Sequence, residues 1–104
     1  MFPEKLIVTV EPTVNEITSG DEATFDIDVQ VFDSDGDPIK GANVIISGLG
    51  GAGSGQTDEY GTAQVKIKVR LESGRIQGFL DVNVKAGSRY EEFLQSDMIA
   101  VVRN

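Results

Sequence analysis

Apolar and polar residues alternate strictly along two long segments of this chain. In residues 23–31 the odd positions hold Ala, Phe, Ile, Val and Val, and Thr, Asp, Asp and Gln lie between them. Residues 63–71 repeat the pattern with Ala, Val, Ile, Val and Leu, separated by Gln, Lys, Lys and Arg. A period of two places every second side chain on the same face, so each segment is predicted to be a strand with one buried and one exposed face.

Further strands and turns complete an all-β pattern. Residues 76–86 also alternate, and shorter β-rich runs lie at residues 6–10, 14–18, 42–47 and 98–102. Turns rich in Asp, Gly, Ser or Pro separate them, at residues 33–38, 58–61 and 72–75. No segment shows the 3.6-residue period of a helix. Residues 1–104 are therefore predicted to form a single immunoglobulin-like domain of a larger protein, an antiparallel β-sandwich of about seven strands with Greek-key connections.

One segment is predicted to be a flexible connection. Residues 48–55 hold five glycines in eight positions, and glycine carries no side chain that could pack as a strand does. The segment also lacks the Gly-Lys-Ser/Thr ending and the following helix that a phosphate-binding loop needs.

The two long alternating strands are predicted to be antiparallel neighbours. If the turns at residues 33–38 and 58–61 lie at the same end of the sandwich, Phe32 lies opposite Thr62, give or take one residue. This register has two consequences, on the exposed and the buried face. It pairs Asp28 with Lys66 and Asp26 with Lys68 on the exposed face, and Val29 with Val65 and Ile27 with Ile67 in the core.

Composition excludes several classes of function. Seventeen acidic and nine basic residues give a net charge of −8, which disfavours binding to nucleic acids and to anionic membrane surfaces. The chain has no cysteine and no histidine, so disulfides, thiolate metal sites and the usual catalytic bases are absent. Catalysis would rest on carboxylates alone, and a domain of this size offers them only turns rather than a cleft. We expect no enzyme, no catalytic residue and no cofactor.

The first residues predict neither a signal peptide nor a membrane helix. The apolar run at residues 6–10 is five residues long, whereas a membrane helix needs about 20. If the parent protein is exported, we expect the signal to lie outside this segment.

Two motifs carry a resemblance to a known family. Residues 33–44 have the pattern D-x-x-G-x-P-x-x-G-x-x-V, and residues 57–63 have T-D-x-x-G-x-A. With the flanking strands, residues 8–86 resemble bacterial immunoglobulin-like domains of the invasin/intimin kind and the related carboxypeptidase-regulatory and transthyretin-like sandwiches. The resemblance implies a repeat module of a cell-surface or secreted protein that serves as stalk, spacer or adhesive tip. Residues 87–95 depart from the pattern, since they are longer and more aromatic than the usual last connection.

Acidic residues are predicted to gather at one end of the sandwich. The set consists of Asp33, Asp35, Asp37, Asp58 and Glu59, and Glu91 and Glu92 are expected nearby. Converging carboxylates suit calcium, which takes six to eight oxygen ligands. The spacing is not that of an EF-hand, because Pro38 and Val44 replace its glycine and glutamate. The simpler interpretation is that Asp and Gly are good turn formers.

Two apolar side chains are predicted to point outward. Ile45 and Phe79 fall on the exposed side of their strands, which is typical of an interface with a neighbouring domain or a partner. Alternatively, residues 90–94 fold over and cover them, and this self-cover is the interpretation that we favour.

The favoured function is a non-catalytic structural or adhesion module of an extracellular or cell-surface protein. The alternative is a ligand-binding accessory module for calcium or carbohydrate. Expected partners are neighbouring domains of the same chain or a surface protein, with no nucleic acid and no membrane insertion. We expect the isolated chain to be monomeric.

Overall fold

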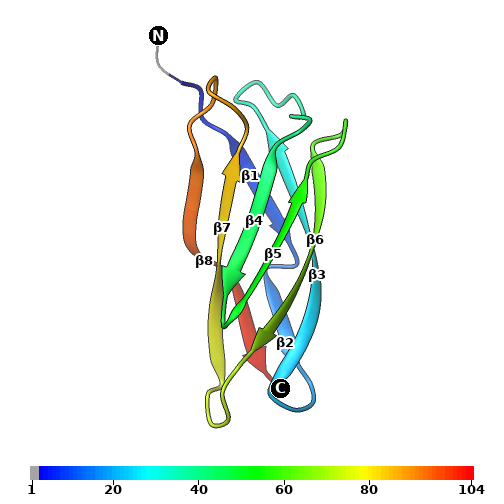
Figure 1. Ribbon diagram of the computed structural model, residues 1–104, viewed down its shortest axis with the longest axis vertical. Helices are drawn as coiled ribbons and strands as arrows, with labels where there is room; N and C mark the ends of the chain where they lie inside the picture. The colour runs from blue at the N-terminus through cyan, green and yellow to red at the C-terminus, as the bar shows by residue number, and fades with distance from the viewer. Residues whose placement is uncertain (1–2) are drawn as a thin grey trace.

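The alternating segments form the long strands of a two-layer sandwich. The computed structural model describes residues 3–104 and contains eight strands and no helix in that range. The strands are β1 (Ile7–Glu11), β2 (Val14–Ile17), β3 (Glu22–Phe32), β4 (Asn43–Gly48), β5 (Gly51–Gln56), β6 (Thr62–Arg70), β7 (Gln77–Lys85) and β8 (Phe93–Arg103). One sheet has the order β1-β3-β6 and the other β2-β8-β7-β4-β5 (Figure 1). The predicted immunoglobulin-like β-sandwich is confirmed, while its Greek-key connectivity stays a prediction.

The core lies between the sheets and follows the alternation. On β3 the buried side chains are Ile27, Val29 and Val31, and β6 and β7 contribute the apolar positions of their own alternation in the same way. Burial of these aliphatic groups is the main favourable term in folding such a domain. Ile76, the first residue of the alternating segment 76–86, lies before β7 and is exposed.

The predicted antiparallel pairing of β3 and β6 is confirmed, but its register is wrong by two residues. Gln30, not Phe32, lies opposite Thr62, because β3 extends past the start of β6. Phe32 instead pairs with Ile7 of β1 and forms a bridge to Pro38. An even shift keeps every side chain on its predicted face.

The individual pairs change accordingly. In place of the four predicted pairs, Asp28 faces Gln64, Asp26 faces Lys66, Val29 faces Ala63 and Ile27 faces Val65. Ion pairs form further along the strands, where Glu22 lies 3.4 Å from Lys68 and 3.6 Å from Arg70. These groups are exposed, so each pair contributes only about 0–1 kcal/mol.

The glycine-rich segment is a strand and not the predicted flexible connection. β5 pairs with β4 through a two-residue turn, and its glycines face β6 in the opposite sheet. A Cβ added to Gly51 or Gly53 would lie 1.9 Å from the Lys68 carbonyl oxygen or 2.4 Å from that of Lys66. Glycine is therefore what allows this strand to pack on the backbone of β6.

The last connection is ordered by the N-terminal segment. Tyr90 N donates to Gly87 O (3.2 Å) and closes a turn. Glu4 N then donates to Arg89 O (3.0 Å), and Glu91 N donates to Glu4 O (2.7 Å). Tyr90 and Phe93 pack against the core, so the aromatic residues of this region cover one end of it.

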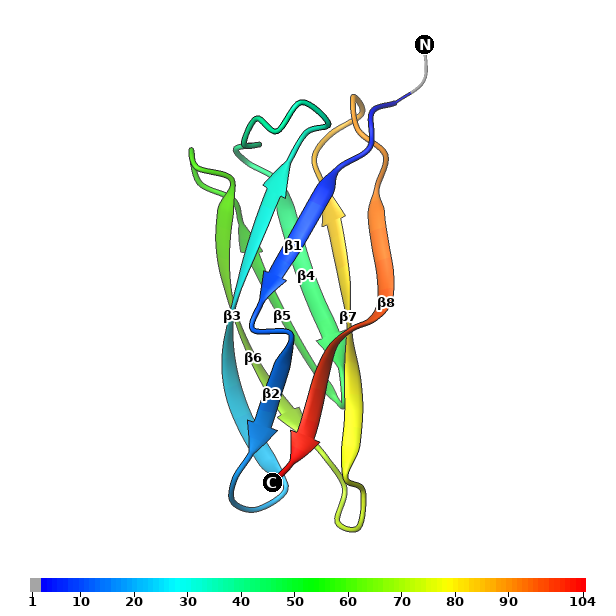
Figure 2. The ribbon, with the colours of Figure 1, turned by 180° about the vertical axis from the view of Figure 1, so that it is seen from behind.

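The molecule is a short rod with two distinct ends. Its extents are 49 × 23 × 18 Å. The upper pole of Figure 1 comprises residues 33–41, 57–61 and 86–92, and the lower pole comprises residues 18–21, 71–76 and the C-terminal end (Figures 1 and 2). β1 and β2 lie in different sheets and are joined at the cis bond between Glu11 and Pro12. β2 runs parallel to β8, which is an exception to the predicted antiparallel pairing.

Candidate functional site

Each acidic turn of the upper pole is closed by its own first aspartate. Asp33 Oδ1 accepts from Asp35 N and Asp37 N, both at 2.9 Å. Asp58 Oδ1 accepts from Tyr60 N (2.9 Å) and Thr62 N (3.0 Å). A short carboxylate that accepts from N–H groups two and four residues ahead stabilises a turn without any ligand.

The two turns lie against each other at Gly61. This residue has φ +76, and a Cβ there would lie 2.6 Å from Val31 O and 3.0 Å from the Pro38 side chain. Gly61 O in turn accepts from Val31 N (2.8 Å). Glycine is therefore needed at this position because of the positive φ and because a side chain would collide first with Val31 O and then with Pro38.

Thr57 links the same two motifs from inside. Its buried hydroxyl donates to Ile39 O (2.6 Å) and accepts from Ala42 N (2.8 Å). Thr57 N also donates to Ala42 O (2.9 Å). A buried backbone N–H or C=O group without a partner is costly, so one hydroxyl satisfies two groups that the loop would otherwise leave unpaired.

The carboxylates of the upper pole lie at one end, but they do not form a cation cage. In residues 3–104 no three acidic side chains come together as metal ligands. Glu92, expected near the acidic turns, instead bonds to Asn83 and lies 3.8 Å from Lys85 on β7. Calcium binding by Asp33, Asp35, Asp37, Asp58 and Glu59 stays a prediction, and a calcium titration followed by thermal melting tests it.

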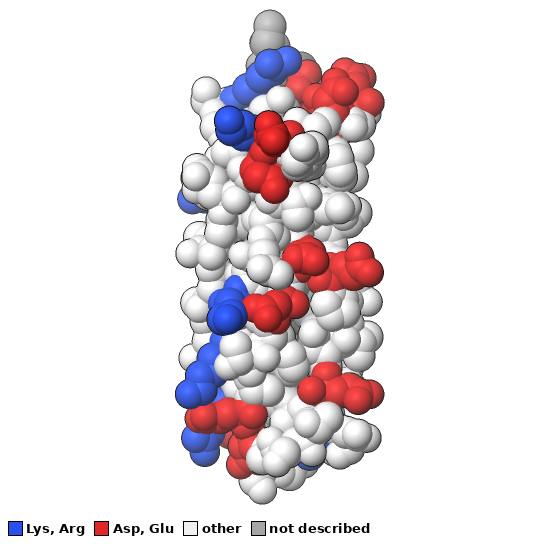
Figure 3. Space-filling view, turned by 90° about the vertical axis from the view of Figure 1, so that its right-hand side faces the viewer, with Lys and Arg blue, Asp and Glu red and all other residues white. Residues whose placement is uncertain are grey.

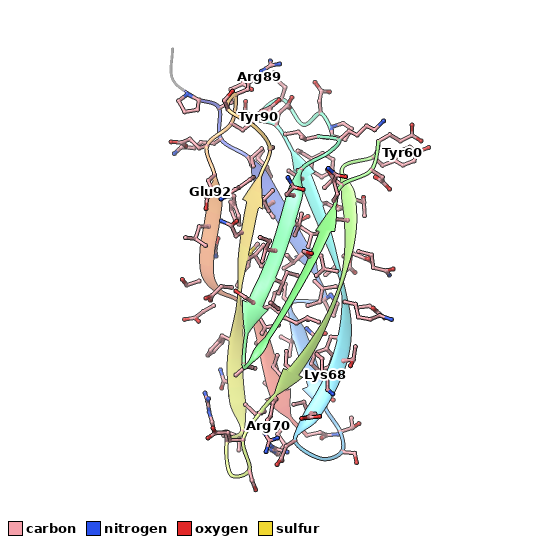
Figure 4. All side chains as sticks on the ribbon, in the orientation of Figure 1. Tyr60, Lys68, Arg70, Arg89, Tyr90 and Glu92 are labelled. Atoms are coloured by element: carbon pink, nitrogen blue, oxygen red, sulfur yellow. The ribbon has the colours of Figure 1, made fainter. Side chains whose placement is uncertain are left out.

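A shallow hollow lies beside Tyr90 at the same pole. It has a volume of about 290 Å³ and is lined by Lys85, Gly87, Tyr90 and Glu92. The guanidinium of Arg89 lies 5.7 Å from the centre of the Tyr90 ring (Figure 4). The two charged residues that line the hollow, Lys85 and Glu92, already pair with each other. Tyr60 projects from the opposite side of the pole, and 71% of its surface is exposed (Figure 4).

The outer face of the five-stranded sheet carries apolar side chains in two places. Ile45 and Phe79 are 43% and 40% exposed, so the predicted cover by residues 90–94 is wrong. That segment runs into β8, where Leu94 pairs with Asn83 and is itself 67% exposed. The physical reason is that Asn83 on β7 separates Ile45 from Leu94 across the sheet.

The apolar side chain of Phe79, in the lower half of this face, belongs to a continuous row. Phe79 lies opposite Ala100, and Ala100 lies opposite Val14 on the edge strand. Val14 is 55% exposed, so the row offers apolar surface across three strands. Phe79 was predicted to face outward from the alternation of its strand, but Val14 was not, because the pairing of β2 with β8 joins segments far apart in the chain.

One residue that sequence analysis did not single out holds the lower pole together. The side chain of Arg103 is 25% exposed and lies 3.2 Å from the carboxylate of Asp21. Its guanidinium also donates to four backbone carbonyl oxygens, those of Gly20 (2.7 Å), Leu71 (2.9 Å), Arg75 (3.0 Å) and Glu72 (3.2 Å). Only the planar five-donor group of arginine suits this arrangement.

The fold and its surfaces define an immunoglobulin-like β-sandwich module. Among protein families, the model described as Macroglobulin domain MG4 matches residues 21–93, which is more than half of the chain. The chain therefore belongs to the macroglobulin MG4 domain family. A search of the curated proteins and a search of the solved structures found no match.

The family assigns the chain to a broad class. Macroglobulin domains are generally non-catalytic modules and occur in secreted or extracellular proteins. The match does not extend to the invasin/intimin kind, so that finer resemblance stays a prediction. Among the described residues there is no helix with the length and apolar character to cross a membrane.

Proposed function

We propose that this chain is a non-catalytic structural module that stacks along its long axis with neighbouring domains of an extracellular protein. The observation that carries the proposal is the position of the chain ends. The first described residues lie at the upper pole and the C-terminal end lies at the lower pole (Figures 1 and 2). A rod 49 Å long that the chain enters at one pole and leaves at the other suits a spacer.

The apolar row of Val14, Phe79 and Ala100 supports contact with a neighbour. It lies on the lower half of the outer sheet face, towards the pole at which the chain leaves. If the module is adhesive, the same row contacts a partner at a cell surface. Ile45 adds a further exposed apolar side chain higher on the same sheet face. Burying such side chains against another domain contributes roughly 25 cal/mol per Å².

The test places Phe79→Asp in the isolated chain and in the whole parent protein. Phe79 is partly exposed, so the isolated chain is expected to melt within a few degrees of the unchanged form. In the parent protein, the same change is expected to lower the melting midpoint of this domain clearly more than it does in the isolated chain. Gln30→Asp, on the outer face of the three-stranded sheet, is the matched control. Equal effects of Phe79→Asp in both settings would contradict the proposal.

A further inference from the structure

β5 is an edge strand with open backbone groups. The sheet order places β4 on one side of it and no strand of residues 3–104 on the other. Thr57 N donates to Ala42 O, just beyond the β4–β5 register, and hydrogen-bonded pairs alternate along an antiparallel ladder. Ala52, Ser54 and Gln56 therefore point their N–H and C=O groups away from β4. All three residues are exposed.

The other edges of the two sheets are protected. β1 has five residues and ends at the charged Glu11, and β2 has only four residues, one of which is Glu16. The glycines of β5 cover the carbonyl oxygens of β6. Natural proteins shield edges by short strands, charges, proline or cover, since an open edge pairs with other strands.

β5 has none of these protections. Its sequence Gly-Ala-Gly-Ser-Gly-Gln contains no charge and no proline, and its register with β4 is continuous without a bulge. Close packing on β6 holds the strand extended. A groove of about 450 Å³ lies over the paired strands β4 and β5 and is lined by residues that include Ile45 and Ser54. At the edge itself, the side chains of Ala52 and Ser54 are small, so they do not cover the outward backbone groups.

Charge is distributed with opposite sign at the two ends of β5. Its upper end leads through Thr57 to the exposed carboxylates of Asp58 and Glu59. At its lower end lie Lys68 and Arg70, whose side chains are 69% and 64% exposed. These two cations share a single carboxylate, Glu22, so positive charge remains. Figure 3 shows the right-hand side of the molecule in Figure 1, with basic side chains along its lower left margin and acidic side chains near both ends.

We infer that β5 pairs antiparallel with β5 of a second copy of this chain. A two-fold axis at Ser54 places Ala52 of one copy opposite Gln56 of the other, and about six backbone hydrogen bonds form between the outward groups. The acidic end of each copy then lies beside the basic end of the other. This local attraction offsets part of the net repulsion between two acidic chains, and it favours the antiparallel arrangement of the two strands.

The inference goes beyond the proposed function, because sideways pairing at β5 is independent of stacking along the long axis. It also runs against the expectation of a monomer.

Sedimentation of the isolated chain over a concentration series, up to about 1 mM, tests the inference, since small interfaces associate weakly. The expected result is a monomer–dimer equilibrium. Amide exchange measured over the same series is expected to slow at Ala52, Ser54 and Gln56 as the dimer forms. If the copies pair through any other surface, the exchange rates of these three amides stay unchanged, which would contradict the inference.

Ser54→Lys places two like charges opposite each other at the axis and is expected to weaken dimerisation at least tenfold. Its Lys side chain points to solvent, so its melting midpoint is expected to match that of the unchanged chain. Gln30→Lys, which adds the same charge on the other sheet, is expected to leave dimerisation unchanged. A monomer at every concentration overturns the inference, and so does a dimer that Ser54→Lys leaves intact.

Discussion

The two poles of the sandwich are closed by different kinds of interaction. At the upper pole, Asp33 and Asp58 accept from N–H groups two and four residues ahead, so the two acidic turns are each closed by a local carboxylate, in addition to the links between them. At the lower pole, Arg103 donates to carbonyl groups between 28 and 83 residues away. Local closure confines the damage from one substitution to one turn. Closure by a single side chain makes several loops depend on it.

The largest expected effect is that of Arg103→Ala. Four carbonyl groups and the Asp21 carboxylate lose their partner, which we expect to cost about 2–4 kcal/mol of unfolding free energy. Thermal melting should show a fall of about 10 °C or more. Arg70→Ala is the control, because the Arg70 guanidinium is exposed and makes one ion pair. Equal loss in both variants would contradict the role of Arg103.

Arg103→Lys sharpens the same point. A lysine keeps the charge and can still approach Asp21, but its compact ammonium group does not match carbonyl groups from separate loops as the guanidinium does. We expect it to recover less than half of the stability lost in Arg103→Ala. Full recovery, measured by chemical denaturation, would mean that charge alone holds the lower pole.

Thr57→Val is expected to have the next largest effect, at the upper pole. The substitution keeps the volume but leaves Ile39 O and Ala42 N without the hydroxyl, at a cost of about 1–3 kcal/mol. Denaturant unfolding measures the loss. Thr57→Ser, which retains the hydroxyl, should recover most of it. If valine is tolerated without loss, the buried hydroxyl does not link the two motifs.

Asp58→Ala should cost less, about 1 kcal/mol, by analogy with the loss of a capping side chain at a helix start. Hydrogen exchange should quicken at Tyr60 and Thr62 while the lower pole is unaffected, as local closure requires. Asp35→Ala removes the same charge from a side chain that makes no hydrogen bond in the described structure, and it should change little. Faster exchange at both poles in Asp58→Ala would break the comparison.

The smallest effect is expected for Glu22→Gln. Its ion pairs with Lys68 and Arg70 are exposed, so the loss should not exceed about 1 kcal/mol. The difference from the unchanged chain should shrink in about 1 M salt, where charges are screened within about 3 Å. A loss that is large and independent of salt would show that Glu22 has a structural role like that of Arg103.

Sequence alone predicted those parts of the fold that depend on local patterns. Alternation in β3, β6 and β7 identified strands and their buried faces, and Asp with Gly identified the turns. The register of β3 with β6 was missed by two residues, because nothing local indicates that Phe32 pairs with β1. β5 was missed since glycine carries no hydrophobic pattern, and its packing depends on β6.

The residues of the candidate surfaces also fall into two groups, those that a local pattern predicts and those that depend on contacts between distant segments. Ile45 and Phe79 were predicted to face outward because strand alternation assigns every side chain to a face. Val14 joins Phe79 only through two strand pairings, and Arg103 meets its partners only in the folded chain. A contact between distant segments leaves no periodic signal in a single sequence.

The position of Arg103 near the end of this segment has a consequence for synthesis of the protein on the ribosome. The hydrogen bonds that Asp33 and Asp58 accept come from residues within four positions of each, so these two turns can close while the chain is still growing. The lower pole has to wait until residue 103 has left the exit tunnel, and until then the loops at residues 18–21 and 71–76 lack their common donor. Nascent chains arrested before and after this residue should therefore differ in protease sensitivity at these two loops.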